Sequence, residues 1–244
     1  MKQRAADIAL LLAVILGLWQ AVHLYAGEEA LASPAVTFSY LADQLGTARF
    51  WGHIAETALA FAWALLYAAL GGLGLGLWFG IHRFAGVVAE PILVALYSLP
   101  KVTLYPVMLL VFGLGLPAKV AFGTLHGIVP VVIFAMNAVR NLNPVLLRTA
   151  RVMRLGPMQT ALSVLMPAAL PEIVSGLRVG FSLTFLGVLI GEMFASKRGL
   201  GFVIINAISL NDSRTIMAVA ALVFAFAALA NGALLALDRR LHHR

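Results

Sequence analysis

The sequence predicts an all-α membrane protein with about six transmembrane helices, and three observations lead to this fold class. Of its 244 residues, 62% are hydrophobic and 11% are charged, whereas soluble domains have about 45–50% apolar and about 25% charged residues. Six runs have at most one formal charge each, at residues 8–27, 57–81, 91–117, 120–139, 173–191 and 215–237. Each reaches the roughly 20 residues, give or take a few, that a membrane-spanning helix needs. No run shows the alternating polarity of a membrane β-barrel strand.

The six predicted helices follow one another with short connections. We place them at residues 8–27, 57–81, 88–113, 118–139, 168–193 and 215–237. Because they use most of the chain, we predict one membrane domain over residues 1–244 and no separate soluble domain. The first run begins like a signal peptide, with Lys2 and Arg4 before it, but it is longer than the roughly 7–15 apolar residues of a signal sequence. We therefore expect a retained first helix.

The basic residues predict the orientation of the chain in the membrane. If the helices alternate in direction, one side receives ten cations, namely Lys2, Arg4, Arg83, Arg140, Arg148, Arg151, Arg154, Arg239, Arg240 and Arg244. The opposite side receives five, namely Arg49, Lys119, Lys197, Arg198 and Arg214. Cytoplasmic loops carry the excess of Lys and Arg, so both termini should be cytoplasmic. This topology accounts for the net charge of +7 without a nucleic-acid partner.

Glycine and proline set two of the predicted helices apart. Gly72, Gly76 and Gly80 recur every four residues, a small-residue stripe that allows membrane helices to approach closely. The stripe favours packing within one subunit over a dimer contact. Prolines interrupt the third helix, where Pro100 removes a backbone donor and freed carbonyl groups need a neighbour or a wet cavity. We therefore expect this helix to line a pathway. Residues 27–51, between the first two spans, fit a short helix lying in the membrane interface.

Several ionisable residues fall inside the predicted spans, where such groups are costly and usually functional. Lys101, next to Pro100, is a candidate cation for an anionic substrate, with a side chain that snorkels to one surface as the alternative. Arg178 either borders the pathway or pairs with a carboxylate such as Glu90, and we favour pairing. Glu192 is expected to be structural or to gate the pathway. His126 is expected to be a packed, hydrogen-bonded histidine.

The segment between the fourth and fifth spans, residues 141–167, is basic and bounded by proline. Asn143 and Pro144 are typical of a helix N-cap and first helical position, and we predict a helix from there to about Leu155, before Gly156. Arg148, Arg151 and Arg154 recur every third residue and would share one broad face. Such a helix would bind either lipid phosphates or a cleft on a cytoplasmic partner.

This segment resembles the cytoplasmic loop of permease subunits of bacterial ATP-binding cassette importers. That loop has the pattern Glu-Ala-Ala, three residues, Gly, nine residues, Ile, one residue, Leu-Pro. Ala150 aligns with the second alanine and Pro167 with the proline, while Arg148, Thr149 and Arg154 replace the glutamate, the first alanine and the glycine. Val164 and Met166 are apolar substitutes.

Further motifs make the resemblance specific to the nitrate, sulfonate and taurine group of these permeases. Upstream lie Leu-Pro-Lys at residues 99–101 and Phe-Gly-Leu-Gly at 112–115. Downstream lie Ala-Ala-Leu-Pro at 168–171, Gly-Leu-Arg at 176–178, Gly-Glu-Met at 191–193 and Gly-Leu-Gly at 199–201. The similarity covers residues 55–231.

The resemblance implies a type I importer permease fold in the bacterial inner membrane. It implies three partners: a second copy of the permease, two cytoplasmic ATP-binding subunits, and a periplasmic or lipid-anchored substrate-binding protein. No cofactor is expected in this chain, because ATP and Mg²⁺ would be bound by the ATPase. The residues expected to couple to the ATPase are Pro144, Arg148, Thr149, Ala150, Arg151, Arg154, Gly156 and Pro167. The candidate pathway residues are Pro100, Lys101, Arg178 and Glu192.

Other function classes fit the sequence less well. The chain has no G-x-x-x-x-G-K-[ST] phosphate loop and no H-E-x-x-H or G-x-S-x-G motif, so it is not expected to be an enzyme. A secondary transporter normally has inverted repeats and more spans, and a channel has no obvious use for the basic loop. We expect the solute to be small and anionic or sulfonate-like. The alternative is a small heterocyclic nutrient such as a thiamine-precursor pyrimidine.

Overall fold

A computed structural model describes the backbone of residues 2–242 and most side chains between residues 6 and 236. The side chains of Lys2, Arg4, Arg239, Arg240 and Arg244, counted above for orientation, lie outside the described residues. The elements are α1 (Lys2–Ala26), α2 (Pro34–Leu45), α3 (Ala48–Ile81), α4 (Arg83–Ser98), η1 (Lys101–Leu104), α5 (Tyr105–Phe112), α6 (Leu116–Arg140), α7 (Pro144–Val152), α8 (Pro157–Thr160), η2 (Ala161–Leu165), α9 (Met166–Ala195), α10 (Leu200–Ser209) and α11 (Ser213–His242).

Five helical stretches of the described chain are long and apolar enough to cross a membrane, at residues 6–26, 48–81, 116–140, 158–194 and 213–236. The remaining predicted helix, the third, over residues 88–113, is broken. Its two halves, residues 83–98 and 101–112, meet at an angle of 94°. Leu99 is extended, as expected for the residue before a proline, and Pro100 has no N–H to continue the helix.

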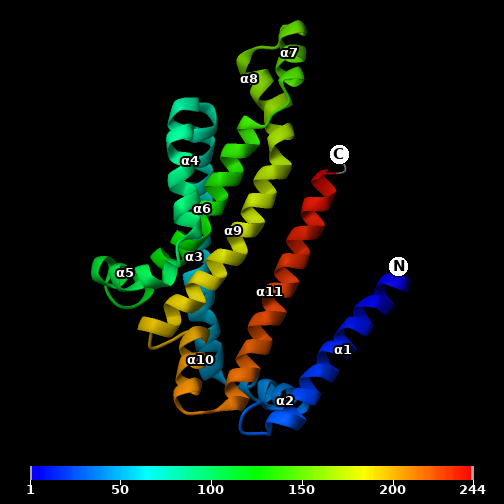
Figure 1. Cartoon of the computed structure of the whole chain (residues 1–244), viewed down its shortest axis with the longest axis vertical. Coiled ribbons are helices and arrows are strands. Elements are labelled where there is room, and N and C mark those ends of the chain that lie inside the picture. The colour runs from blue at the N-terminus through cyan, green and yellow to red at the C-terminus, as the bar shows by residue number, and fades with distance from the viewer. Residues whose placement is uncertain (1, 243–244) are drawn as a thin grey trace.

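Helices α3, α6 and α9 pack side by side to form the core of the molecule (Figure 1). The glycine stripe of α3 faces α6, as predicted for packing within one subunit. A Cβ atom on Gly76 would lie 2.6 Å from Ala135 Cβ, and one on Gly80 would lie 2.7 Å from Val139 Cβ. Glycine therefore sets the separation of α3 and α6.

Aromatic side chains attach α11 to this core. The ring of Phe61 on α3 meets the rings of Phe181 and Phe185 on α9 edge-on, with centroids 4.9 and 5.3 Å apart. Phe226 on α11 completes the cluster, 4.9 Å from Phe185. Such aromatic pairs contribute about 0.5–1.5 kcal/mol each beyond the area they bury.

Helix α2 is the short helix predicted between the first two spans. Ser33 caps it by accepting a hydrogen bond from the Val36 N–H, and Pro34 occupies its first turn. The Tyr40 hydroxyl is 2.8 Å from the Thr215 hydroxyl oxygen, which ties α2 to the start of α11.

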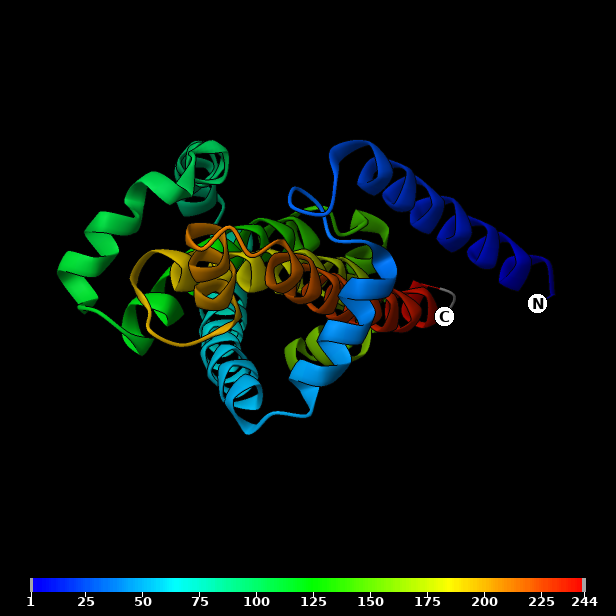
Figure 2. The same cartoon turned by 90° about the horizontal axis from the view of Figure 1, so that it is seen from below.

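Helix α1 lies apart from the core and diverges from the other helices (Figure 2). Its attachment is at its C-terminal half, where the Trp19 indole N–H donates to the Ala32 carbonyl and His23 Nδ1 lies 2.6 Å from the Leu31 carbonyl. None of its apolar span is buried.

The elements outside the core gather at its two ends (Figure 1). Helices α7 and α8 project at one end, which we call the α7 end. Helices α2 and α10 lie at the other end, which we call the α10 end. The free ends of α1 and α11 are both directed towards the α7 end.

Candidate functional site

Helix α7 is a short helix with well-defined caps at the α7 end of the core. Asn143 Oδ1 accepts a hydrogen bond from the Val145 N–H at 2.9 Å, and Pro144 supplies the first helical residue. Both capping residues behave as the sequence predicts. The helix ends at Val152, so the predicted end at Leu155 is wrong.

Three backbone hydrogen bonds end the helix. The N–H groups of Met153, Arg154 and Leu155 donate to the carbonyls of Thr149, Arg151 and Ala150, at 2.9, 3.0 and 3.0 Å. The last two bonds form the Schellman motif, whose C′ residue adopts a left-handed conformation and is usually glycine. Here that residue is Arg154, with φ of 54°. Arg154 therefore lies beyond the helix, and Arg148 and Arg151 are the two basic residues of α7.

A groove of about 640 Å³ separates α7 from the start of α9. Thr149, Ala150, Val164 and Pro167, all at positions of the loop pattern, line it. Ala150 is buried, with 2% of its surface exposed, which explains a small residue at this position. Gly156 follows the Schellman turn, and its N–H donates to the Gln159 side chain at 3.3 Å. The residues at the positions of the loop pattern are therefore those that hold α7 against the start of α9.

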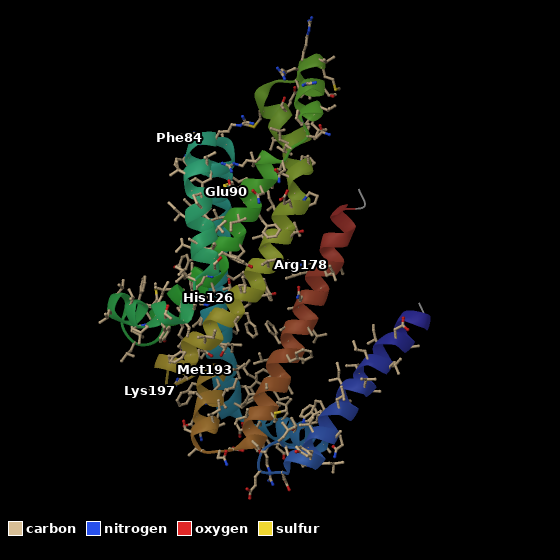
Figure 3. The ribbon with its side chains drawn as sticks, in the orientation of Figure 1. Phe84, Glu90, His126, Arg178, Met193 and Lys197 are labelled. Carbon is tan, nitrogen blue, oxygen red and sulfur yellow. The ribbon has the colours of Figure 1, made fainter. Side chains whose placement is uncertain are left out.

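The candidate pathway residues Lys101 and Arg178 lie near a shared neighbour, Tyr97. Lys101 lies in η1, just after Pro100, and its Nζ donates to the Tyr97 carbonyl at 3.2 Å. The same Nζ lies 5.3 Å from the centre of the Tyr97 ring. Arg178, on α9, lines a pocket together with Tyr97, and Figure 3 shows it part-way along α9.

The predicted pairing of Arg178 with Glu90 is wrong. Glu90 Oε2 accepts a hydrogen bond from Arg140 Nη1 at 2.9 Å, close to the α7 end. Figure 3 shows Glu90 on α4 and Arg178 on α9, well separated along the core. The Glu90–Arg140 pair could not be predicted from the sequence, because it depends on how α4 folds back beside the end of α6.

Glu192 lies in a buried polar cluster near the α10 end. Its Oε2 accepts hydrogen bonds from the Thr57 hydroxyl at 2.8 Å and from the Gly201 N–H at 3.0 Å. Lys119 Nζ, with 1% of the side chain exposed, lies 3.7 Å from Glu192 Oε1 and 2.9 Å from Glu56 Oε1. A cation so deeply buried needs such carboxylate partners.

The cluster also explains the Gly-Leu-Gly motif after α9. The Thr57 hydroxyl accepts a hydrogen bond from the Leu200 N–H at 2.8 Å. Gly199 has φ of 115° and lies directly against the Glu192 carboxylate, where a Cβ atom would collide with it. The loop from α9 to α10 is thereby attached to α3 and α6. Sequence reasoning missed this role of Lys119, which it counted only among the five cations on the side opposite the termini.

His126 is packed and hydrogen-bonded, as predicted. It is 8% exposed, and its Nδ1 lies 2.9 Å from the Phe122 carbonyl. Within the described residues, no group of three or more His, Asp or Glu side chains is arranged to hold a metal ion.

Comparison with known proteins places these features in one family. Residues 72–243 match the family described as the inner membrane component of binding-protein-dependent transport systems. The chain belongs to this family. The permease is 30% identical to a probable ABC transporter permease protein of Haemophilus influenzae, over 85% of this chain and 84% of the relative. It is also 30% identical to the taurine transport system permease protein of Escherichia coli, over 80% and 70% of the two chains.

A solved structure supports the fold of the permease. The MetNI methionine ABC transporter in an inward-facing conformation superposes with a TM-score of 0.66 at 19% identity, covering 78% of this chain and 96% of that one. The permease thus has the type I importer fold and is a multi-pass inner-membrane protein. Permeases of this family work with ATP-binding subunits and substrate-binding proteins, and ATP hydrolysis belongs to the separate subunit.

Proposed function

We propose that the chain forms, as a pair of identical copies, the membrane pore of an ATP-driven importer. Two cytoplasmic ATP-binding subunits would supply the energy and bind ATP and Mg²⁺, and a periplasmic or lipid-anchored binding protein would deliver the solute. The chain itself is expected to need no cofactor. The observation that carries this proposal is the arm formed by α7, which is capped at both ends and projects beyond the core with Arg148 and Arg151 exposed.

The arm suits the transmission of motion from a partner. Asn143 and the Schellman turn fix the two ends of α7, and buried Ala150 holds it close to the start of α9. A partner that displaces α7 would therefore displace α9, which belongs to the core. The position of α7 would then depend on whether the partner has bound nucleotide, although α7 itself does not contact the nucleotide.

The solute is proposed to be a small anion, such as a sulfonate. Two cations, Lys101 and Arg178, lie inside the membrane region around Tyr97, where a buried or partly buried charge usually marks an ion or substrate path. The similarity to a taurine permease supports the same class of solute. Both termini are proposed to be cytoplasmic, because they point to the same side as the basic arm.

Charge reversal on the arm tests the proposal. We expect R148E/R151E/R154E to abolish co-purification with the ATP-binding subunit, because charge-assisted contacts across the interface would become repulsive. The matched control is R49E/K197E, which reverses two exposed charges at the α10 end and should leave assembly unchanged. ATP-dependent uptake by the reconstituted assembly is the second measurement. Unchanged co-purification of the triple variant, or uptake by the permease alone without ATP, would refute the proposal.

A further inference from the structure

A pocket of about 540 Å³ lies at the α10 end, between α3, the connection from α5 to α6 and the loop from α9 to α10. Four charged residues line it, namely Glu56, Lys119, Lys197 and Arg198. Lys197 and Arg198 are exposed, and Figure 3 shows Lys197 where the chain leaves α9. The pocket therefore has a basic rim at one end of the membrane-spanning core.

The buried cation of the pocket, Lys119, already has partners within the protein. Its Nζ lies 2.9 Å from Glu56 Oε1 and 3.7 Å from Glu192 Oε1, and it donates to the Arg198 carbonyl at 3.2 Å. Three partners match the three donors of an ammonium group. Lys119 therefore has no donor left for a ligand.

The two cations of the rim are not compensated in this way. Neither the Lys197 ammonium nor the Arg198 guanidinium forms an ion pair or a hydrogen bond within the described part of the chain. Glu56 is the one carboxylate among the described residues that line the pocket, and it is paired with Lys119. The donors of Lys197 and Arg198 are therefore available to a ligand.

The loop that carries these two cations is fixed on both sides. Before them, the Ser196 hydroxyl accepts a hydrogen bond from the Arg198 N–H at 3.1 Å. After them, the Gly199 N–H donates to His53 Nδ1 at 3.1 Å, and Lys119 holds the Arg198 carbonyl. Because the backbone is already ordered, binding a ligand there avoids most of the cost of ordering the loop.

The position and the chemistry of the rim point to an anion. The α10 end is the end proposed to lie outside the cytoplasm, where loops carry fewer Lys and Arg residues than cytoplasmic loops do, so orientation does not explain two adjacent cations there. A guanidinium group offers five N–H donors and an ammonium group three. Together they match the negative charge and the several acceptor oxygens of a sulfonate or nitrate group.

We propose that this pocket is the outer entry site of the permease for a small oxyanion, such as a sulfonate or nitrate group, which Lys197 and Arg198 hold. Leu114 and Phe194, 79% and 61% exposed, supply an apolar part of the lining for the organic portion of a sulfonate. This inference rests on the proposed function, because it assigns the first binding site on the path that an importer requires.

The test exploits the absence of cysteine from the chain, because one introduced thiol is then a unique reporter in the permease. Leu114 lines the pocket, whereas Tyr25, near the end of α1, is 95% exposed and lines none of the pockets described above. The variants L114C and Y25C, assembled with the ATP-binding subunit in phosphatidylcholine nanodiscs, form a matched pair. Each is treated with a sulfonatoethyl or a trimethylammonioethyl methanethiosulfonate, and the mass of the permease chain reports modification.

After division by each reagent's rate with free cysteine, we expect the anionic reagent to modify L114C about tenfold faster than the cationic one, since a charged cleft raises the local concentration of counter-ions by about 10–10³. K197Q/R198Q should bring this ratio close to one, and K197R/R198K, which keeps both charges, should retain it. The ratio at Y25C should be the same in all three backgrounds.

Competition identifies the ligand. Sodium methanesulfonate or sodium nitrate, compared with sodium chloride at the same ionic strength, should slow the modification of L114C but not of L114C/K197Q/R198Q. A second set of nanodiscs contains phosphatidylglycerol, which offers a lipid phosphate as the other source of an oxyanion.

Three results would overturn the inference: no preference for the anionic reagent at L114C, a preference that survives K197Q/R198Q, or protection by phosphatidylglycerol without any effect of methanesulfonate or nitrate. Co-purification with the ATP-binding subunit verifies that each variant folds. The arm variants test the proposed function separately, so a failure of the entry site and a failure of the proposed function give different results.

Discussion

Arg154 occupies a backbone position that glycine normally fills. Its φ of 54° and the two flanking hydrogen bonds identify it as the C′ residue of a Schellman motif, and the related loop pattern has glycine there. A left-handed conformation costs an L-residue with a side chain about 1–2 kcal/mol. The departure from the pattern is thus a substitution that keeps the turn but strains it.

We expect R154G to stabilise the end of α7 by about 1 kcal/mol, because glycine adopts positive φ without the steric cost. The backbone amides of α7 should then exchange hydrogen about fivefold more slowly, since 1.4 kcal/mol corresponds to a factor of ten. R154A is the control, because it removes the charge and keeps the strain. Equal protection in R154G and R154A would contradict this explanation.

Glu192 is the second residue whose role depends on its surroundings. It is fully buried and accepts hydrogen bonds from Thr57 and Gly201 beside Lys119. The sequence could predict that a carboxylate in a span is structural, but not that residues from three other elements meet it. Contacts between residues 135 and 9 positions apart are set by packing rather than by local pattern.

We expect E192A to destabilise the permease by about 3–5 kcal/mol, because it leaves two buried donors, the Thr57 hydroxyl and the Gly201 N–H, without their acceptor and removes one of the two carboxylates beside buried Lys119. For a chain of this size the midpoint of thermal unfolding should fall by about 10 °C. E192Q, which keeps the volume and an acceptor oxygen, should lose less. E28A is the matched control, since the Glu28–Arg214 pair is more than half exposed and worth at most about 1 kcal/mol. Equal midpoints for E192A and E28A would refute a structural role of the cluster.

At the scale of the elements, helices with long apolar runs were predictable because run length alone defines them. The broken third span was not fully predictable. Its prolines indicate an interruption, but the 94° turn at Leu99 and Pro100 depends on where α5 finds space beside α6. Helix α10 was missed, since its ten residues are too few to span the membrane.

The glycines of α3 provide a test of how the core is packed. A Cβ atom on Gly76 would lie 2.6 Å from Ala135 Cβ and 2.7 Å from the Val132 carbonyl oxygen, whereas one on Gly74 would meet nothing within 4 Å. We expect G76A to lower the free energy of unfolding by about 1–3 kcal/mol through overpacking. G74A should be neutral or stabilise by up to about 1 kcal/mol, because alanine favours helix over glycine. Thermal unfolding of the two variants measures the difference, and equal destabilisation would exclude close packing as its cause.

At the scale of the whole molecule, the sequence predicted the class of fold and the family, both of which are confirmed by the match over residues 72–243 and by the superposition on a solved importer. Both could be predicted because hydropathy and the loop patterns depend on residues that are close together in the sequence. The pocket that Arg178 shares with Tyr97 was not predicted, because its lining residues come from α4, α9 and α11, which are far apart in the sequence.

The orientation in the membrane leads to a prediction for the complete chain. Cysteine introduced at Glu29, in the connection before α2, should react with a membrane-impermeant maleimide added to intact cells. Cysteine introduced at Thr149, on α7, should react only after the membrane is permeabilised, because the basic arm is expected to be cytoplasmic. The reverse pattern would contradict the proposed sidedness.

The buried cluster of Glu192, Lys119 and Thr57 has a mechanical consequence. It locks three core helices together at the end of α9 opposite α7, and α9 is 30 residues long, or about 45 Å at 1.5 Å per residue. Helices fastened at one end and interlocked by glycine in between have little freedom to slide. A push on α7 should therefore tilt the core as a rigid rod and carry the displacement from the α7 end to the α10 end.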